Sequence, residues 1–394
     1  MMETKEQDRH WHLVRNDNGE WISDENVVFL TKEEARHLQI MSRLAGKQIS
    51  IQHGYDGTLW CYKHDLANSN NIPMGKKDLL KKIQEVTGYD GIKFPAQISF
   101  SISNKTLVIH ISGTEVRDNM QTDGSAFEGW AISLLAWLPE DITQVMLNWD
   151  NPEYSKDKEM RNKQEKHYNR FVMRAMFFEK NFEWAFIDES RRKEIDDVKR
   201  VIPLLVMNYP KSDSKEKVAE SDKVNKGEAK LERQIVNALR RDIELSDHQL
   251  PVGLFKNDVK SINNYTPRGA SQIDIWQLEN DVMRIFELKD ETNNKIGIIS
   301  ELLFYANTIS LLVNGKIRFP DSLKLEKKNY RHIQELSSAI EHHEINYVEA
   351  IFLNYSFHPL IGGRIDRVLS ILNSGVRNVH VVFKHMSVNN ILCI

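Results

Sequence analysis

Two neighbouring segments with alternating residue character constrain the fold more than any other feature of this sequence. Segment 271–276 reads Ser-Gln-Ile-Asp-Ile-Trp, and segment 284–289 reads Arg-Ile-Phe-Glu-Leu-Lys. Such alternation is typical of β-strands, in which successive side chains point to opposite faces of a sheet. Glu287 and Lys289 are two residues apart, so a carboxylate and an ammonium group are expected side by side on one face.

Asn280-Asp281 fits the two-residue turn of a hairpin between these strands, and in that register Asp274 lies directly opposite Glu287. Directly opposed side chains have Cβ atoms roughly 4.5–5.5 Å apart, where two like charges are destabilising unless a third group compensates them. A divalent cation would do so. Carboxylate oxygens suit Mg²⁺ or Mn²⁺, and no Cys-x-x-Cys or His-Glu-x-x-His pattern favours zinc. Asn-Asp is a weaker turn signal than Asn-Gly, so a slipped register is the alternative.

A third acid is available on the helix predicted over residues 230–241. Glu232 lies beside the apolar stripe that contains Leu231 and Ile235, so it can face inward at the edge of that stripe. Glu228, one turn earlier, is the substitute candidate.

The elements predicted around these acids follow the order α-β-β-β-α-(α)-β-α-β. After the first helix they are strands 250–255, 271–278 and 282–289, helix 296–313, a helical region 329–342, strand 347–353, helix 365–373 and strand 379–383.

Glu232, Asp274 and the triplet Glu287-Leu288-Lys289, followed by an amphipathic helix, resemble the PD-(D/E)xK phosphodiesterase superfamily, which has the restriction-endonuclease-like fold. The resemblance covers about residues 227–394 and implies a mixed central sheet flanked by helices. The initial Pro-Asp of the family is Ile273-Asp274 here; the proline is not a metal ligand. Other acid-x-Lys triplets occur in the chain, but only this one is on an apolar strand that follows a second acid-bearing strand.

By this resemblance, Asp274, Glu287 and the backbone carbonyl of Leu288 would hold Mg²⁺ or Mn²⁺, and Glu232 would join directly or through water. Lys289 would orient the attacking water and help to deprotonate it. The implied activity is a metal-dependent endonuclease that hydrolyses DNA phosphodiester bonds, with microbial defence or restriction as a natural setting. The alternatives are a catalytically silent module that binds nucleic acid or serves as an assembly scaffold, and an RNase of the same fold.

The charge balance of the same region gives it no net attraction for DNA. From residue 227 onward there are 20 Lys and Arg and 20 Asp and Glu, and the whole chain has a net charge of -3. Such a nuclease would rely on a second copy or a partner subunit to hold its substrate. Within the region, the candidate nucleic-acid contacts are Arg233, Arg240, Arg241, Lys256, Lys260, Arg268 and Tyr305. Tyr305 and Glu301 share one helical face and would border the site, or Tyr305 would pack in the core with Glu301 on the surface.

A charged stretch over residues 208–226 divides the chain. It holds five lysines and four acids but only three aliphatic residues, Val218, Ala219 and Val224, so it cannot bury enough surface to offset its ordering entropy. We interpret it as a linker between an N-terminal α+β domain, residues 1–207, and a nuclease domain, residues 227–394. The fold class is therefore α/β.

The N-terminal domain carries no recognisable functional motif, and a role in sensing, binding or assembly is expected for it. Its predicted elements are a hairpin over 11–22, a helix over 31–45, strands 97–103 and 107–112, a helix over 127–138, a charged loop over 153–166, a helix over 167–180 and a buried strand over 201–207.

Composition and termini favour a cytoplasmic protein that does not enter a membrane. Two cysteines cannot form a disulfide framework, and the charged first ten residues lack the apolar core of a signal peptide. The longest apolar run, residues 130–138, is well short of the ~20 residues that a membrane-spanning helix needs.

Overall fold

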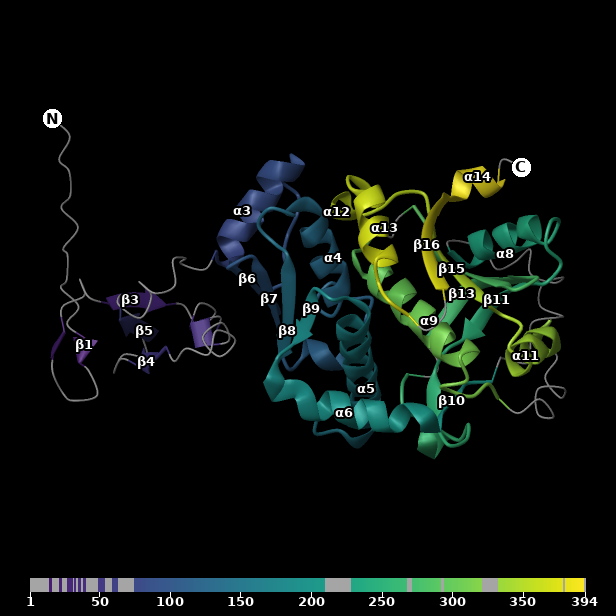
Figure 1. Cartoon of the computed structure of the whole chain (residues 1–394), viewed down its shortest axis with the longest axis horizontal. Helices are drawn as coiled ribbons and strands as arrows, with labels where there is room; N and C mark the ends of the chain where they lie inside the picture. The colour runs from purple at the N-terminus through teal and green to yellow at the C-terminus, as the bar shows by residue number, and fades with distance from the viewer. Residues whose placement is uncertain are drawn as a thin grey trace.

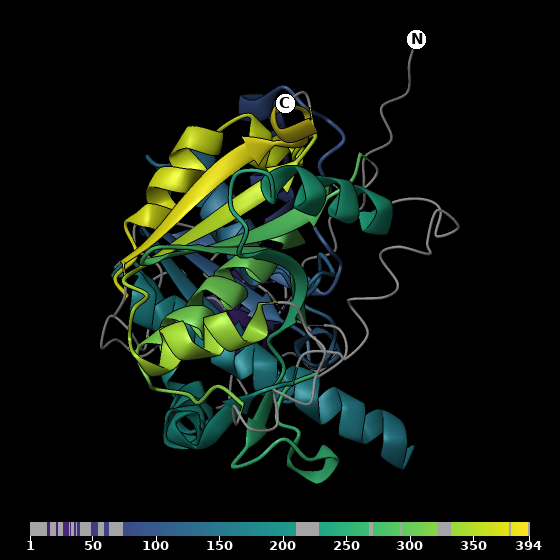
Figure 2. The ribbon, with the colours of Figure 1, turned by 90° about the vertical axis from the view of Figure 1, so that its right-hand side faces the viewer.

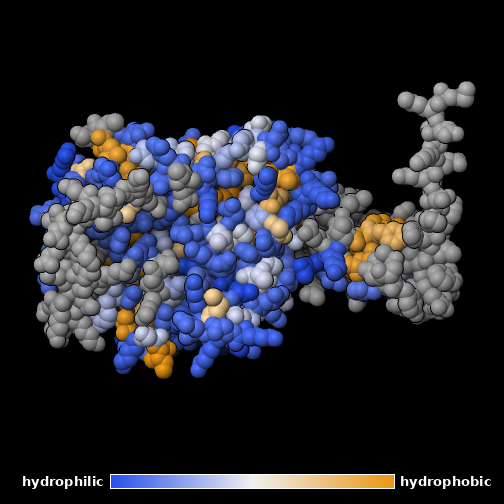
Figure 3. Space-filling view, turned by 180° about the vertical axis from the view of Figure 1, so that it is seen from behind, coloured by the Kyte–Doolittle hydropathy of each residue, from blue (hydrophilic) through white to orange (hydrophobic). Residues whose placement is uncertain are grey.

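The computed structural model describes residues 74–209, 228–267, 271–291, 294–320, 332–377 and 380–392, together with short stretches before residue 63. These residues form a mixed α/β fold with two main sheets and helices packed between them (Figure 1). The surface seen in Figure 3 is largely hydrophilic, with small hydrophobic patches.

The larger sheet has five strands in the order β11-β13-β14-β15-β16. Its strands are β11 (Ser246–Pro251), β13 (Gln272–Glu279), β14 (Val282–Lys289), β15 (Tyr347–Asn354) and β16 (His380–Ser387). The first three are antiparallel, whereas β14, β15 and β16 are parallel. Parallel neighbours need a crossover connection, and helix α9 (Gly297–Val313) and helix α13 (Ile365–Asn373) lie in those connections.

The β13–β14 hairpin has the predicted register. The turn is Asn280-Asp281, and Asn280 has a φ of 53°, a conformation that asparagine tolerates better than most residues. The last pair of the ladder is Ile275 with Phe286. Asp274 and Glu287 are the next residues along the two strands in the same register, but the pairing of β13 with β14 ends at Ile275 and Phe286.

The second sheet has four strands in the order β6-β7-β8-β9. Its elements are β6 (Ile98–Ser103), β7 (Thr106–Ile111), α4 (Phe127–Trp137), β8 (Gln144–Trp149), α5 (Lys158–Asn181), β9 (Ala185–Ile187) and α6 (Arg192–Val201). The strands β7, β8 and β9 are parallel, so helices α4 and α5 return the chain between them.

Smaller elements complete the described chain. They are β1 (Val14–Arg15), β2 (Trp21–Ile22), β3 (Val27–Leu30), β4 (Gln52–His53), β5 (Leu59–Tyr62), α3 (Lys76–Thr87), η2 (Glu115–Arg117), η3 (Glu189–Arg191), η4 (Ile202–Leu204), β10 (Leu205–Met207), α8 (Glu228–Leu239), β12 (Leu254–Lys256), η5 (Ser261–Asn263), α11 (Ile333–Glu341), α12 (Pro359–Gly362) and α14 (Val388–Leu392). Within the described residues, no helix combines the length and apolar character of a membrane span.

One hydrophobic cluster extends across both halves of the chain. It includes Phe127 of α4 and Phe171 of α5 from the first half, and Met283 of β14 and Leu302 of α9 from the second. Strand β10 also pairs with β12 across the predicted boundary. A second cluster joins α8 to the five-stranded sheet. The ribbon shows α8 lying against that sheet (Figures 1 and 2). The two halves on either side of residues 208–226 therefore share a core; residues 210–227 lie outside the described chain.

Buried polar contacts join the halves as well. The Arg174 guanidinium of α5 pairs with the Glu128 carboxylate of α4, and the Ser300 hydroxyl of α9 donates to the same carboxylate at 2.7 Å. The Asn181 amide donates to Asn307 of α9 at 2.6 Å. Breaking a buried ion pair strongly destabilises the folded protein, because it leaves an uncompensated charge in the core. These contacts therefore restrict how α9 can pack against α4 and α5.

Three predicted elements differ from the structure. The loop expected over 153–166 is mostly helix: α5 begins at Lys158, where the Asp157 side chain accepts a hydrogen bond from the Met160 backbone at 2.8 Å. Lys, Arg, Glu and Gln are good helix formers, so a charged segment without apolar periodicity can still be helical. The strand expected over 201–207 is confined to β10, because residues 201–204 end α6 and form η4. The strand expected over 250–255 is divided between β11 and β12.

The other predicted elements are confirmed where the structure describes them. Val14 pairs with Ile22 in the expected N-terminal hairpin. Of the helix expected over 31–45, only residues 32, 35, 36, 38 and 39 are described, and they are helical.

A close backbone approach between the halves depends on glycine. A Cβ on Gly129 of α4 would lie 2.5 Å from the backbone oxygen of Ile296, which cannot move without moving α9. Gly129→Ala is therefore expected to lower the free energy of unfolding by about 1–3 kcal/mol, although alanine normally favours a helix. Thermal and urea denaturation measure the change.

Gly362→Ala in α12 is the matched control, because its Cβ would make an ordinary 3.4 Å contact with Phe357. Equal stability of the Gly129→Ala and Gly362→Ala proteins would contradict the packing argument.

Candidate active site

The acids of the hairpin lie on the face of the sheet that α9 covers. Glu287 is 2% exposed and Lys289 is 6% exposed, so both charges are buried. The Lys289 ammonium pairs with the Glu287 carboxylate and, at 3.1 Å, with Glu301 of α9. The Asp274 carboxylate accepts a hydrogen bond from the backbone N–H of Leu288 at 2.8 Å. The strand alternation read from the sequence thus brings Asp274, Glu287 and Lys289 together.

Helix α9 supplies two further groups. Glu301 and Tyr305 are 1% and 2% exposed, so the alternative with Glu301 on the surface is wrong. The Gln121 side-chain amide, from the first half of the chain, donates to Glu301. Burial raises the pKa of Tyr305 well above its ordinary value, and the carboxylates of Glu301, Glu287 and Asp274 add to that effect. Tyr305 is therefore a neutral phenol at the edge of the acid cluster.

The electrostatics of the cluster show a shortage of positive charge. Burial raises the pKa of Asp274 to about 8, against the opposing effect of Lys289. Burial, then Asp274 and Glu301, raise the pKa of Glu287 well above its ordinary value. Within the described residues, the Glu287 Oε2 atom is buried without a hydrogen-bond partner. The Lys289 ammonium thus contacts two of the three carboxylates, Glu287 and Glu301, and a further cation would favour the charged forms of the cluster.

Glu232, the predicted third ligand, faces the other side of the sheet. It accepts a hydrogen bond from Nδ1 of His248 at 2.6 Å, and His248 pairs with Ile275 on the face covered by α8. Its charge still contributes to the raised pKa of Asp274. Glu228, the substitute candidate, begins α8.

The donor set suits a hard cation with an incomplete protein shell. In the part of the chain that the structure describes, no three carboxylate, imidazole or thiol groups converge closely enough to ligate one ion. Asp274 and Glu287 together supply carboxylate oxygens, and the Leu288 carbonyl is the third donor implied by the resemblance. Mg²⁺ usually keeps several waters and takes one or two carboxylates, so this small set fits it.

A buried arginine from the first half holds the start of strand β13. Arg170 of α5 donates to the Ser271 hydroxyl at 2.7 Å and to the Asn119 side chain at 3.0 Å. Burial lowers the pKa of Arg170 to about 10, so the guanidinium stays charged at neutral pH. Ser271 directly precedes the strand that carries Asp274, so Arg170 helps to fix the position of that acid.

Sequence reasoning missed Gln121 and Arg170 because no local pattern marks them. Gln121 is 180 residues from Glu301, its partner. Arg170 lay within a predicted helix, but nothing in that pattern indicated that its side chain would be buried against the second half.

The predicted nucleic-acid contacts are mostly engaged within the protein. Arg240 pairs with Asp247 at 2.9 Å, and the exposed Lys260 pairs with Asp258. The remaining candidates are placed as follows: Lys256 lies over the Tyr265 ring, Arg233 and Arg241 are on or just after α8, Tyr305 is buried, and Arg268 lies outside the described residues.

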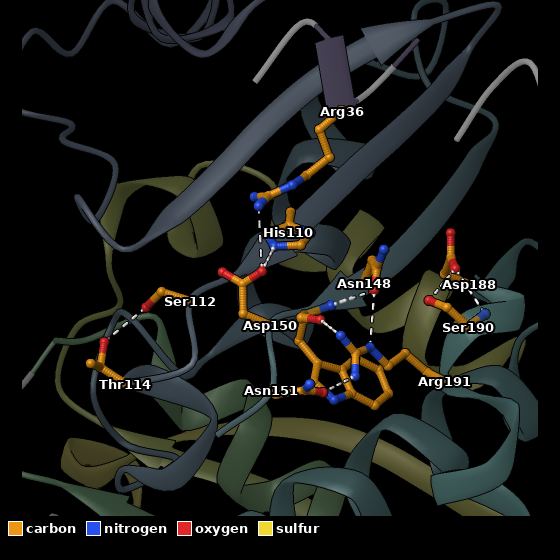
Figure 4. Close-up of polar contacts among 11 residues, drawn as sticks. Arg36, His110, Ser112, Thr114, Asn148, Asp150, Asn151, Asp188, Ser190 and Arg191 are labelled. Atoms are coloured by element: carbon orange, nitrogen blue, oxygen red, sulfur yellow. Dashed lines mark hydrogen bonds and ion pairs between the residues drawn. The ribbon is translucent and has the colours of Figure 1, made fainter. Parts of the chain in front are cut away.

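A second polar cluster lies at the carboxyl ends of β7 and β8. Figure 4 shows His110 and Arg36 directed at the Asp150 carboxylate, at 3.0 and 3.4 Å. Burial and the Arg36 guanidinium lower the pKa of His110, so its ring is neutral at neutral pH. Nearby, Arg191 donates to the Asn151 side chain and to the Trp149 carbonyl. These groups largely satisfy one another, which favours a structural role for the cluster.

The chain matches no known protein-family model, and no curated protein or solved structure is significantly similar to it. The resemblance to the PD-(D/E)xK superfamily therefore depends on the site residues and their arrangement alone.

The raised pKa of Asp274 predicts a pH-dependent stability effect. Its folded-state pKa of about 8 lies above the ordinary value of 3.8, so the folded protein binds this proton more tightly than the unfolded chain does. The resulting stabilisation is complete below about pH 4 and is lost as the pH rises to about 8. Asp274→Asn keeps an acceptor for Leu288 and removes the charge, so it is expected to raise the unfolding temperature by several degrees near pH 8 and little near pH 4.

Thermal unfolding in metal-free buffer across this range measures the effect. Asp366→Asn, an exposed acid on α13, is the control and should give no such trend. A stability gain for Asp274→Asn that is the same at both ends of the range would contradict the assignment.

Proposed function

We propose that this protein is a metal-dependent endonuclease of the PD-(D/E)xK type that hydrolyses DNA phosphodiester bonds. One observation carries the proposal: the half-buried Asp274 and the buried Glu287 lie on neighbouring strands, burial raises the pKa of both carboxyl groups, and Lys289 is beside them. Buried acids with strongly perturbed pKa values are costly to fold and cluster at functional sites. An RNase would use the same site, so plasmid DNA, single-stranded DNA and RNA are to be compared directly.

The arrangement of elements supports a restriction-endonuclease-like core for this half. The acid-bearing hairpin is followed by α9 and then by two parallel strands, β15 and β16, which extend the sheet beyond β14. That order gives the mixed central sheet, with helices on both faces, that the resemblance implies.

In this proposal Asp274, Glu287 and the Leu288 carbonyl hold Mg²⁺ or Mn²⁺. When bound, the ion would polarise the phosphoryl oxygen and lower the pKa of a water. Lys289 is held between Glu287 and Glu301, so it can orient the attacking water and stabilise charge on the phosphate. Gln121 and Arg170 act as positioning residues, because they fix Glu301 and the start of β13.

The setting of the reaction is also proposed. Microbial defence or restriction in the cytoplasm suits an enzyme of this type, by analogy with the superfamily. The pairing of Arg240 with the buried Asp247, and the equal numbers of acids and bases from residue 227 onward, support the need for a second copy or a partner subunit to hold DNA.

Glu287→Gln and Lys289→Met are each expected to reduce Mg²⁺-dependent cleavage of plasmid DNA by at least about 100-fold, the scale of losing one transition-state contact. Both substitutions nearly preserve side-chain volume, and far-UV circular dichroism checks that the fold is intact. Asp366→Asn is the control and should cleave as the natural sequence does. Cleavage that survives Lys289→Met and Glu287→Gln would overturn the proposed mechanism.

A catalytically silent scaffold is the second candidate, and the Lys289 ammonium that already bridges Glu287 and Glu301 favours it. Calorimetric titration with Mn²⁺ separates the two. The enzyme is expected to bind Mn²⁺ with an affinity that falls at least about tenfold in Asp274→Asn, because the ion loses a charged ligand. A scaffold would give no Mn²⁺ binding that depends on Asp274.

A further inference from the structure

A pocket of about 430 Å³ lies where the two halves meet, away from the acid cluster. It is formed by the C-terminal part of α5, by α6 and η4, and by the end of α9 with the residues that follow it. Small-molecule sites usually measure roughly 300–1,000 Å³ and are found preferentially between packed domains and helices. The size and location of this pocket therefore fit a small ligand.

The wall of the pocket is mostly apolar. Met176 and Phe177 from α5, Ile202 and Pro203 from η4, and Leu311 from α9 line it. Met176, Phe177 and Leu311 are themselves nearly buried, so they form a fixed floor. A ligand for this surface needs an apolar body, because burying apolar area is the main source of its affinity.

The remaining lining residues give the pocket a positive rim. They are Lys180, Lys199, Lys316 and Glu179. The Glu179 charge is neutralised within the protein, because Arg192 donates to both of its oxygens at 2.7 and 3.0 Å. Lys199 makes an exposed pair with Asp196 at 3.1 Å, an arrangement that contributes little. Lys180 and Lys316 are exposed and have no ion-pair partner within the described residues.

We propose that this pocket binds a small amphipathic anion, with its apolar body against Phe177 and Leu311 and its charged group between Lys180 and Lys316. The charge complementarity is specific: an apolar wall alone would accept neutral molecules equally well, whereas the lysine rim favours a carboxylate or similar anion. This site is separate from the acid cluster, so the proposal does not depend on the nuclease activity.

Decanoate is the probe, and decanol is its neutral counterpart. In calorimetric titration of the full chain, decanoate is expected to bind at one site per chain and at least about tenfold more tightly than decanol, because a hydrogen bond between two charged groups is stronger than one to a neutral hydroxyl. Decanoate is also expected to raise the unfolding temperature in a concentration-dependent way.

The double variant Lys180→Met, Lys316→Met removes the rim charges and keeps the long side-chain stems. It is expected to bind decanoate about tenfold more weakly and decanol unchanged. The double variant Lys77→Met, Lys81→Met removes two exposed charges from α3, far along the chain from the pocket, and should behave as the natural sequence does. The unfolding temperature of each variant without ligand checks its fold.

Three results would overturn the proposal: no saturable binding of decanoate to the natural sequence, equal affinity for decanoate and decanol, or unchanged decanoate affinity in the Lys180→Met, Lys316→Met protein. Loss of decanoate binding in the α3 control would also count against it, because the effect would then reflect overall charge.

Discussion

The burial of Glu287 and Glu301 around the Lys289 ammonium, with the half-buried Asp274 next to them, is the interaction on which the rest of the structure depends. Taking charges out of water costs several kcal/mol per ion, and their mutual attraction offsets this only when partners are well placed. Here one ammonium contacts two carboxylates, and the pKa values of Asp274 and Glu287 are raised. Apolar side chains of similar size would fold with less penalty. Carboxyl groups that are gathered at a cost to the stability of the folded protein are expected where a cation has to bind.

The cluster also depends on the packing between the halves. Gln121 reaches Glu301 from the first half, and Arg170 fixes the residue before β13. The Gln121–Glu301 contact requires α9 to lie close to the segment that leads into α4, and the glycine at position 129 permits the close approach of α4 to the start of α9. The first half is therefore part of the site's supporting structure. The charged stretch at residues 208–226 divides the chain in sequence. In the structure the two halves share one hydrophobic core.

The sequence predicted the features that local patterns determine. Alternation and a two-residue turn located the β13–β14 hairpin and its register, and the amphipathic repeat located α9 within one residue. It did not predict the long-range polar contacts, because nothing near Gln121 or Arg170 specifies a partner more than 100 residues away. The same limit applies to Glu232: its place beside the apolar stripe was visible, but its hydrogen bond to His248 depends on how α8 packs against β11. The first residues of α5 were predicted to be a loop because they are polar and lack apolar periodicity. Their helix propensity and the Asp157 N-cap make them helical.

The charge arrangement has a consequence for how a nuclease of this kind would hold its substrate. Long-range attraction of DNA normally comes from Lys and Arg that neutralise phosphates. Arg240 and Lys260 already pair with acids, and the second half has equal numbers of both charges. Because burial raises the pKa of Asp274 to about 8 and that of Glu287 well above its ordinary value, the metal-free cluster offers a phosphate no net positive charge, and a divalent cation would supply it. Metal binding would then be a precondition for substrate binding as well as for hydrolysis. DNA affinity in that case rises with the metal concentration, and its dependence on monovalent salt is shallow, because few phosphates are neutralised by side chains.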